Sequence, residues 1–193
     1  MTDLERMLSE LRSTPPSDLE RNTVVGVGAA DLAARTDSPI GPVWISWSTR
    51  GVTALSPLFE TSTFDDFMEQ HRRATYEASR LPSDLSDEVA TALETGDSRE
   101  VSVDMAGLGD FQRSVLGACA TIPTGQVRPY GWIASEIGNP GSVRAVGTAL
   151  GRNPIPLIVP CHRVVRSDGS VGNYAFGPEI KHDLLVREGA LLA

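Results

Sequence analysis

Residues 144–165 read RAVGTALGRNPIPLIVPCHRVV, and this stretch is the most informative part of the chain. Near its end, Cys161 stands between Pro160 and His162, with valines on both sides. A thiol with an ordinary pKa of about 8.5 is a poor nucleophile and needs a base or a positive environment to ionise. His162 can supply that base, although neighbouring side chains do not easily face each other, so a bridging water is expected. The stretch therefore predicts a reactive thiol, with a chance Cys-His pair as the alternative.

The residues before the cysteine predict a helix with an unusually small surface. SVRAVGTAL is expected to form a helix that begins at a Ser142 cap. Ala145, Gly147 and Thr148 are small, and Arg144 lies near the start of the helix. Small side chains permit the close approach of a partner, which is either another helix or a narrow groove of DNA.

Two further helices are expected upstream. PYGWIASEIG (129–138) predicts a short helix, and the NPG that follows it is a turn, so residues 129–150 have a helix-turn-helix pattern. That pattern alone is a weak sign of DNA binding, because many helical hairpins bind nothing. GDFQRSVLGACATI (109–122) predicts a longer helix, whose apolar stripe comprises Phe111, Val115, Leu116, Cys119 and Ile122. Cys119 is interpreted as a core residue, since free cysteine packs as a small hydrophobe.

The first half of the chain has the pattern of a small sheet with helices. Region 23–57 is strand-like, and residues 43–47 predict a strand that is joined to a second strand by a turn at 48–51. The other expected elements are helices over 63–80 and 83–95 and a short strand at 101–103. Residues 1–22 look like an appendage, in which STPPSD ends a short helix.

The composition is that of an ordinary soluble globular protein, with 193 residues, 40% apolar and 22% charged. No apolar run approaches the roughly 20 residues of a membrane span, and the N-terminus lacks the pattern of a secretory signal. The two cysteines, Cys119 and Cys161, form neither a disulfide framework nor a metal-ligand spacing. Reduced thiols in a cytoplasm are therefore expected.

Charge is distributed unevenly along the chain, whose net charge is -8. The first 100 residues hold 18 acidic and 9 basic residues, whereas the remainder holds 7 and 8. Six arginines fall between 113 and 166 against one acid, Glu136; they are Arg113, Arg128, Arg144, Arg152, Arg163 and Arg166. A phosphate backbone responds to local charge, so this half is compatible with DNA. The alternative is a set of scattered, solvated arginines.

The second half of the chain resembles the C-terminal domain of the O6-alkylguanine-DNA alkyltransferases, also called methylated-DNA–protein-cysteine methyltransferases. The resemblance covers about 105–193 and is carried, in order, by FQRSVL, IPTGQV, YG, RAVGTALGRNP, PCHRVV, GSVGNY and KHDLLVREGA. SPIGPVWISWSTRGVTAL weakly resembles the hairpin of that family's N-terminal domain. Residues 1–22, the expected appendage, have no counterpart in the family. The resemblance implies an α/β protein with a small mixed sheet domain at 23–104 and a helical, winged-helix-like domain at 105–193.

The implied activity is direct reversal of O6-alkylguanine, mainly methylguanine, in double-stranded DNA by a cytoplasmic monomer that needs no cofactor. Cys161 would accept the alkyl group irreversibly. His162 would activate it through a water, and Glu188 would orient His162. Asn153 would bridge the turn between the recognition helix and the cysteine.

The resemblance also assigns residues to the base and to the duplex. Its substrate-binding set would be Tyr130, Val164, Tyr174, Ala175 and Phe176. Within this set, the carbonyl of Val164 and the backbone N–H of Ala175 would bind the base. Arg144 would enter the base stack in place of the flipped nucleotide, and the other DNA contacts would be Ala145, Gly147, Thr148 and Arg152.

Some features depart from the family pattern. Phe176 stands where glycine is common, which predicts poor acceptance of large alkyl groups. The N-terminal half has no cysteine and only one histidine, His71, so the structural zinc site of some members is not expected. Two other functions stay open: a non-catalytic sensor of alkylated DNA, and a hydrolase using Cys161, His162 and Glu188. The number of reactions per protein molecule distinguishes the three functions: one for alkyl transfer, none for the sensor and many for the hydrolase.

Overall fold

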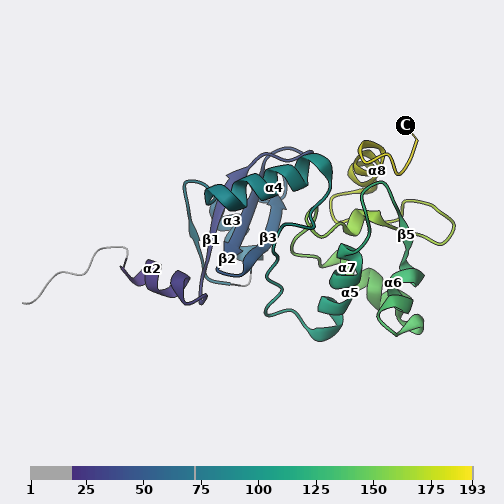
Figure 1. The fold of residues 1–193 in the computed structure, drawn as a ribbon, viewed down its shortest axis with the longest axis horizontal. Coiled ribbons are helices and arrows are strands. Elements are labelled where there is room, and N and C mark those ends of the chain that lie inside the picture. The colour runs from purple at the N-terminus through teal and green to yellow at the C-terminus, as the bar shows by residue number, and fades with distance from the viewer. Residues whose placement is uncertain (1–18, 72, 193) are drawn as a thin grey trace, which may run out of the picture.

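A computed structural model describes residues 19–71 and 73–192 (Figure 1). The helix expected within 1–22 lies mostly outside these residues; the described chain begins with α2, Leu19–Gly26, which crosses the expected boundary at 22/23. The architecture is mixed α/β, as expected. Among the described residues, no helix is both long and apolar enough to cross a membrane.

A four-stranded sheet with the order β3-β2-β1-β4 forms the N-terminal half. Its strands are β1 Asp31–Thr36, β2 Val43–Ser48, β3 Gly51–Pro57 and β4 Thr75–Glu77. The predicted hairpin is confirmed as β2–β3. All residues of β2 are buried because both faces of the sheet are covered. Val43 and Ile45 join the main core, whereas Trp44 packs with Phe67 on the other face.

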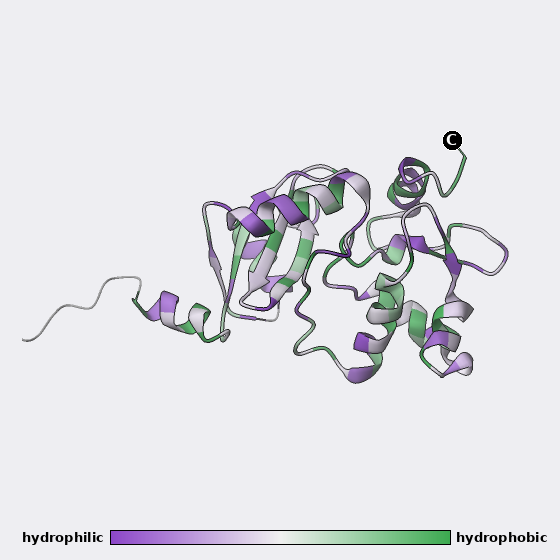
Figure 2. Ribbon diagram, viewed as in Figure 1, coloured by the Kyte–Doolittle hydropathy of each residue, from purple (hydrophilic) through white to green (hydrophobic). Residues whose placement is uncertain are grey.

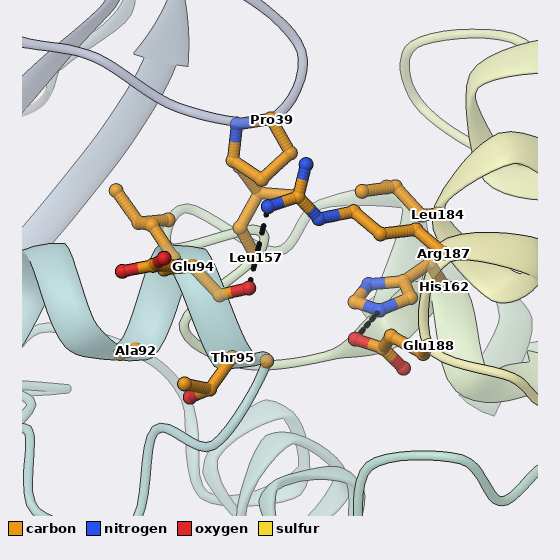
Figure 3. A pocket seen from close by; sticks show the side chains of 11 residues that line it. Pro39, Ala92, Glu94, Thr95, Leu157, His162, Leu184, Arg187 and Glu188 are labelled. Carbon is orange, nitrogen blue, oxygen red and sulfur yellow. Dashed lines mark hydrogen bonds and ion pairs between the residues drawn. The ribbon is translucent and has the colours of Figure 1, made fainter.

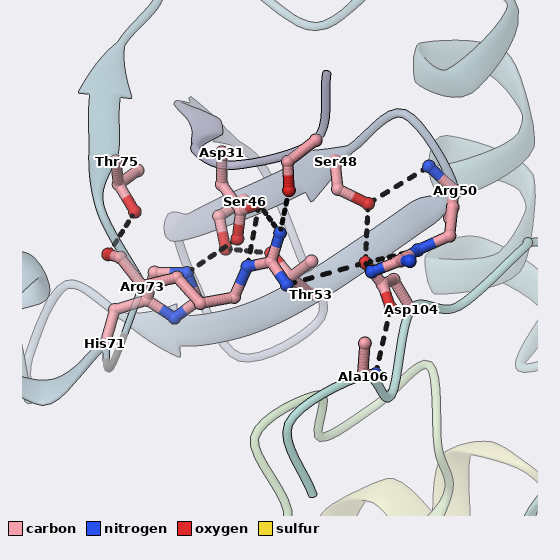
Figure 4. A network of polar contacts seen from close by, with 11 residues as sticks. Asp31, Ser46, Ser48, Arg50, Thr53, His71, Arg73, Thr75, Asp104 and Ala106 are labelled. Carbon is pink, nitrogen blue, oxygen red and sulfur yellow. Dashed lines mark hydrogen bonds and ion pairs between the residues drawn. The ribbon is translucent and has the colours of Figure 1, made fainter. Parts of the chain in front are cut away.

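The predicted helix at 63–80 is wrong over its second half. Helix α3, Phe64–Gln70, begins at a Thr63–Asp66 capping box and ends at His71. The chain then forms β4, which pairs parallel with β1. Buried Asp31 at the start of β1 explains the change of direction, because it binds His71 at 2.9 Å and the Arg73 Nε at 3.0 Å (Figure 4). This polar network outweighs the local helical pattern.

The predicted helix at 83–95 is confirmed as α4, Ser83–Thr95. Helix α4 ends at Gly96, whose φ of +74° is a left-handed conformation that favours glycine. The strand expected at 101–103 is reduced to a single bridge between Val52 and Val103. Next to it, Asp104 accepts from Ser48 and Arg50 (Figure 4).

Helices dominate the C-terminal half. They are α5 Asp110–Ala120, α6 Tyr130–Glu136, α7 Val143–Gly151 and α8 Pro178–Arg187, with 3-10 turns at Pro140–Ser142 and Cys161–Arg163. The three helices expected over 109–150 are thereby confirmed. Short strands β5, Arg128–Pro129, and β6, Val164–Val165, pair in parallel.

Two local expectations in this half are wrong. Ser142 stands at the start of α7, but its hydroxyl donates to the Asn139 carbonyl and does not cap the helix. Phe111, the first residue of the expected stripe, lies in the first turn of α5 and is 37% exposed. The rest of the stripe is buried, including Cys119.

One hydrophobic core joins the two halves. It extends from Val43 and Ile45 of the sheet to Leu184 of α8. Figure 2 shows green, hydrophobic segments both in the sheet and in the helices of the C-terminal half. The segment before the cysteine is hydrogen-bonded to the first half: Leu55 N donates to Pro154 O (2.8 Å), and Ser98 Oγ donates to Ile158 O (2.6 Å). The first half thus supports the backbone that carries Cys161.

Candidate active site

Cys161 begins a 3-10 turn that directly follows Pro160. The residue is only 6% exposed, and the Asn153 Nδ2 amide lies 3.2 Å from its Sγ. The same amide nitrogen donates to the Val159 carbonyl at 2.9 Å, and the Asn153 Oδ1 accepts from Ile155 N at 3.0 Å. Asn153 therefore ties the end of α7 to the cysteine.

His162 and Arg163 both bind one carboxylate. The Nε2 of His162 lies 3.0 Å from Glu188 Oε1, and Arg163 donates from Nε to Oε2 and from Nη2 to Oε1, each at 2.8 Å. Arg163 also donates to the carbonyls of Ile122 and Gly96. Its role could not be read from the PCHR motif, because these partners are distant in sequence.

The second ring nitrogen of His162 has a different environment. Nδ1 is buried and has no hydrogen-bond partner among the described residues. An ionised carboxylate only accepts hydrogen bonds, so the bond to Glu188 places the ring proton on Nε2. Nδ1 then carries the free lone pair and can take a proton. Behind the ring, a cavity of about 40 Å³ is lined by Leu157, Leu184 and Glu188, among others (Figure 3).

Burial and hydrogen bonding set the charges of this group. Burial raises the pKa of Cys161, opposed by the Asn153 hydrogen bond and the Lys181 ammonium. Burial lowers the pKa of His162, opposed by Glu188. Burial alone would raise the pKa of Glu188, but hydrogen bonds from His162 and Arg163 outweigh it and lower the pKa to about 2. At neutral pH the resting site holds a neutral thiol, a neutral imidazole and an ionised carboxylate.

Lys181 is a functional candidate that the sequence analysis missed. Its side chain is completely buried, with Nζ donating to the Val164 carbonyl at 2.6 Å and to the Asn173 carbonyl at 3.3 Å. Burial lowers its pKa to about 8, and no carboxylate pairs with it within the part of the chain that the structure describes. The signal was present, since helical spacing puts Lys181 on the face of Leu184 and Leu185.

A cavity of about 550 Å³ opens beside the thiol. It is lined by Tyr130, Val143, Arg144, Gly147, Thr148, Leu150, Gly151, Cys161, Arg166, Asn173, Tyr174 and Ala175. It contains two arginines and no acid, in a chain whose net charge is -8. Arg166 was not among the predicted site residues, although the uneven arginine distribution could have indicated it.

Seven predicted site residues do not line this cavity: Asn153, His162, Glu188, Val164, Phe176, Ala145 and Arg152. Ala145 and Arg152 are exposed on and just after α7, and Asn153 reaches the thiol from beneath. Val164 is buried, and its carbonyl oxygen already accepts a hydrogen bond from Lys181. The second lone pair of that oxygen can accept one further hydrogen bond. Phe176 packs behind Tyr174, at a centroid distance of 5.3 Å. His162 likewise contributes to the reactive group from outside the cavity.

Known proteins are similar to this chain over most of its length. The family model described as "6-O-methylguanine DNA methyltransferase, DNA binding domain" matches residues 110–190. The methylated-DNA–protein-cysteine methyltransferase of Salmonella typhimurium is 37% identical over 176 residues, covering 83% of this chain and 97% of that protein. Its Methanosarcina acetivorans counterpart is 38% identical over 157 residues, covering 80% and 96%.

A solved structure shares the fold as well. The crystal structure of Mycobacterium tuberculosis OGT in complex with DNA is 36% identical, has a TM-score of 0.68, and covers 83% of this chain and 93% of that one. Sequence identity of this extent over most of both chains goes beyond a shared fold. The chain belongs to the family of methylated-DNA–protein-cysteine methyltransferases.

Proposed function

We propose that this protein repairs O6-alkylguanine in double-stranded DNA, mainly O6-methylguanine, by moving the alkyl group to Cys161. A sulfur–carbon bond forms as the bond between that carbon and O6 breaks, and guanine departs. The thiol proton passes to His162 and is returned to the guanine, so atoms and charge balance. The observation that carries this proposal is the position of Cys161 beside an acid-free cavity, in contact with Asn153 and next to the His162–Glu188 pair.

Activation of the thiol follows from the charges. The unpartnered Nδ1 of His162 takes the proton through a bridging water, and Glu188 stabilises the imidazolium that forms. The Lys181 ammonium then stabilises the thiolate, because no carboxylate of the described residues pairs with it. The Asn153 amide contributes a hydrogen bond to the same sulfur.

A buried thiol cannot reach a base inside a duplex. The alkylated nucleotide must leave the stack, at a cost of a few kcal/mol. Helices α6 and α7 act as a helix-turn-helix within a winged-helix-like domain, and Arg144 fills the vacated space from the minor groove. Gly147, Thr148, Ala145 and Arg152 form the surface that approaches the backbone.

The extruded base occupies the cavity of about 550 Å³. Tyr130 and Tyr174 line it, and the Ala175 N–H and the Val164 carbonyl bind the base edge. Binding as a monomer is sufficient, because one chain supplies every group in this mechanism.

Stoichiometry tests the proposal. After incubation with excess O6-methylguanine duplex, intact-protein mass spectrometry should show a gain of one methyl group, and peptide mapping should place it on Cys161. Cys161→Ser should gain nothing while still binding DNA, and Cys119→Ser should react normally. No gain in the unmodified protein would favour the sensor, and product exceeding protein in moles would favour the hydrolase.

A further inference from the structure

An aromatic contact connects the N-terminal sheet with the wall of the cavity. Phe59 lies in the turn after β3, and its ring meets Phe176 edge-on, at a centroid distance of 5.9 Å and an angle of 88°. Phe176 meets Tyr174 in the same manner, at 5.3 Å and 82°. Tyr174 in turn lies edge-on to His162, at 6.4 Å and 78°. Four rings thus extend from the sheet to the histidine beside Cys161.

The turn that carries Phe59 is well supported. Leu58 N donates to Pro42 O at 3.0 Å, and the N–H groups of Glu60 and Thr61 both donate to Pro57 O at 3.0 Å. The Thr61 hydroxyl also donates to Ser56 Oγ. Phe59 is nevertheless 56% exposed. Its position therefore rests on the hydrogen bonds of this turn and on the ring contact with Phe176.

The loop on the other side has fewer supports of its own. Residues 171–174 belong to no helix or strand. The Lys181 ammonium holds the Asn173 carbonyl at 3.3 Å, and Gly177 N donates to Tyr174 O at 3.2 Å. Tyr174 and Ala175 line the cavity, whereas Phe176 does not, so Phe176 stands behind the wall. The hydroxyl of Tyr174 is buried and has no hydrogen-bond partner in the described parts of the chain, so ring packing has to hold this side chain.

We propose that Phe59 is a positioning residue for alkyl transfer, which acts through Phe176 to hold Tyr174 against the base cavity. The N-terminal sheet thereby limits how far the Tyr174 side chain can move away from the cavity. Phe176 restricts large alkyl groups by supporting Tyr174 from behind, and not by occupying the cavity itself. This inference rests on the proposed alkyl transfer and adds a specificity role for the N-terminal half.

The test compares two substrates of different bulk. Rates of Cys161 alkylation are measured with O6-methylguanine duplex and with free O6-benzylguanine, in the parent, Phe59→Ala, Phe176→Ala and the double variant. An edge-on aromatic pair contributes enough for an effect of about 2- to 10-fold. Phe59→Ala should raise the ratio of the benzyl rate to the methyl rate by that factor, because a released Tyr174 yields to the larger group.

Coupling between the rings is the decisive readout. In the Phe176→Ala background, Phe59→Ala should change the ratio no further, because its route to Tyr174 is already lost. Phe59→Tyr keeps the ring and should restore the parent ratio, and Phe111→Ala, which removes a half-exposed phenylalanine elsewhere, should leave it unchanged.

An unchanged ratio in Phe59→Ala, or equal fold-changes in both backgrounds, overturns the inference. A purely structural role would slow both substrates equally, which also leaves the ratio unchanged and counts against it. The parent protein separates this failure from failure of the proposed function: if the parent takes no methyl on Cys161, the function itself is wrong.

Discussion

Glu188 binds His162 and Arg163 at once, with its Oε1 3.0 Å from His162 Nε2 and 2.8 Å from Arg163 Nη2. The guanidinium keeps the carboxylate ionised, and the carboxylate keeps the ring proton on Nε2. The geometry of one buried ion pair therefore decides which nitrogen of His162 can act as a base.

The first prediction concerns the pH dependence of alkyl transfer. Burial lowers the pKa of His162 below its usual 6.5, so the neutral, basic form persists below that pH. The rate should therefore stay high as the pH is lowered to 6.5, and it should fall only below that pH. Single-turnover rates between pH 5 and 8 check this, and an acid limb centred above 6.5 would contradict it.

Glu188→Gln tests the tautomer argument. A glutamine amide can donate to or accept from Nε2, so the ring proton is no longer held there. The rate should fall by at least about tenfold at every pH, since general-base catalysis typically contributes 10²–10⁴-fold. The acid limb should not move upward, because the charge that raised the pKa of His162 is gone. A rate equal to the parent's would reject the orienting role.

Glu188 should also affect acid stability. Its pKa is about 2 in the folded protein against an ordinary value of 4.5, so its contribution to the free energy of unfolding is complete above about pH 4.5. That contribution is lost as pH falls from 4.5 towards 2. Denaturant unfolding at several pH values should show this loss in the parent. Glu188→Gln should be less stable at pH 7 but should have a flatter acid dependence, and parallel curves would argue against the shift.

Lys181→Met should separate stability from activity. The lysine has a folded pKa of about 8 against 10.5, so burying its charge costs stability below pH 8, and this cost disappears as pH rises towards 10.5. Methionine should therefore abolish the rise in the free energy of unfolding between pH 8 and 10.5, while at pH 7 the removed cost of the buried charge is opposed by the loss of the donor to the Val164 and Asn173 carbonyls. Alkyl transfer should nevertheless slow, because the thiolate loses its nearby cation. A variant that reacts at the parent's rate would exclude that role.

The arginines of the cavity should be separable by salt dependence. Arg166 has no carboxylate partner in the described ion pairs. Its side chain and that of Tyr130 both lie next to Gly172, since a Cβ added to that glycine would be 3.6 Å from the Arg166 Nε and 3.6 Å from the Tyr130 hydroxyl. If Arg166 contacts one phosphate, Arg166→Gln should reduce the slope of log affinity against log salt by about 0.9. Reaction with the free base should be affected less than binding to the duplex, because the free base carries no phosphate. Arg99→Gln, which removes an exposed arginine paired with Asp97, is the matched control and should leave the slope unchanged.

Arg144→Ala should act differently from Arg166→Gln. Its loss should slow the repair of a paired duplex lesion much more than reaction with free O6-methylguanine, because only the duplex requires base extrusion. Rates measured with both substrates check this. Equal losses on the two would remove Arg144 from the flipping step.

The sequence alone predicted the reactive group and most local elements. The PCHR motif indicated Cys161 and His162 as its members, and the order of motifs around it identified the family. An apolar stripe predicted α5, acidic residues near its start indicated α4, and two strand-like runs around a turn indicated the β2–β3 hairpin. Local signals were sufficient for these elements. Local pattern failed at 71–80, where Asp31 of a distant strand binds His71 and Arg73 and turns a helical stretch into β4.

Only the tertiary structure decided the contacts between segments that are far apart in the chain. Arg163 joins the ends of α4 and α8 through Gly96 and Glu188, and Phe59 reaches Phe176 across 117 positions. The residues next to Arg163 and Phe59 in the sequence do not indicate these partners, because hydrogen bonds and ring contacts depend on distance in space and not on separation in sequence. For the same reason Phe176, which its position in the chain assigned to the cavity, stands behind the wall that it supports.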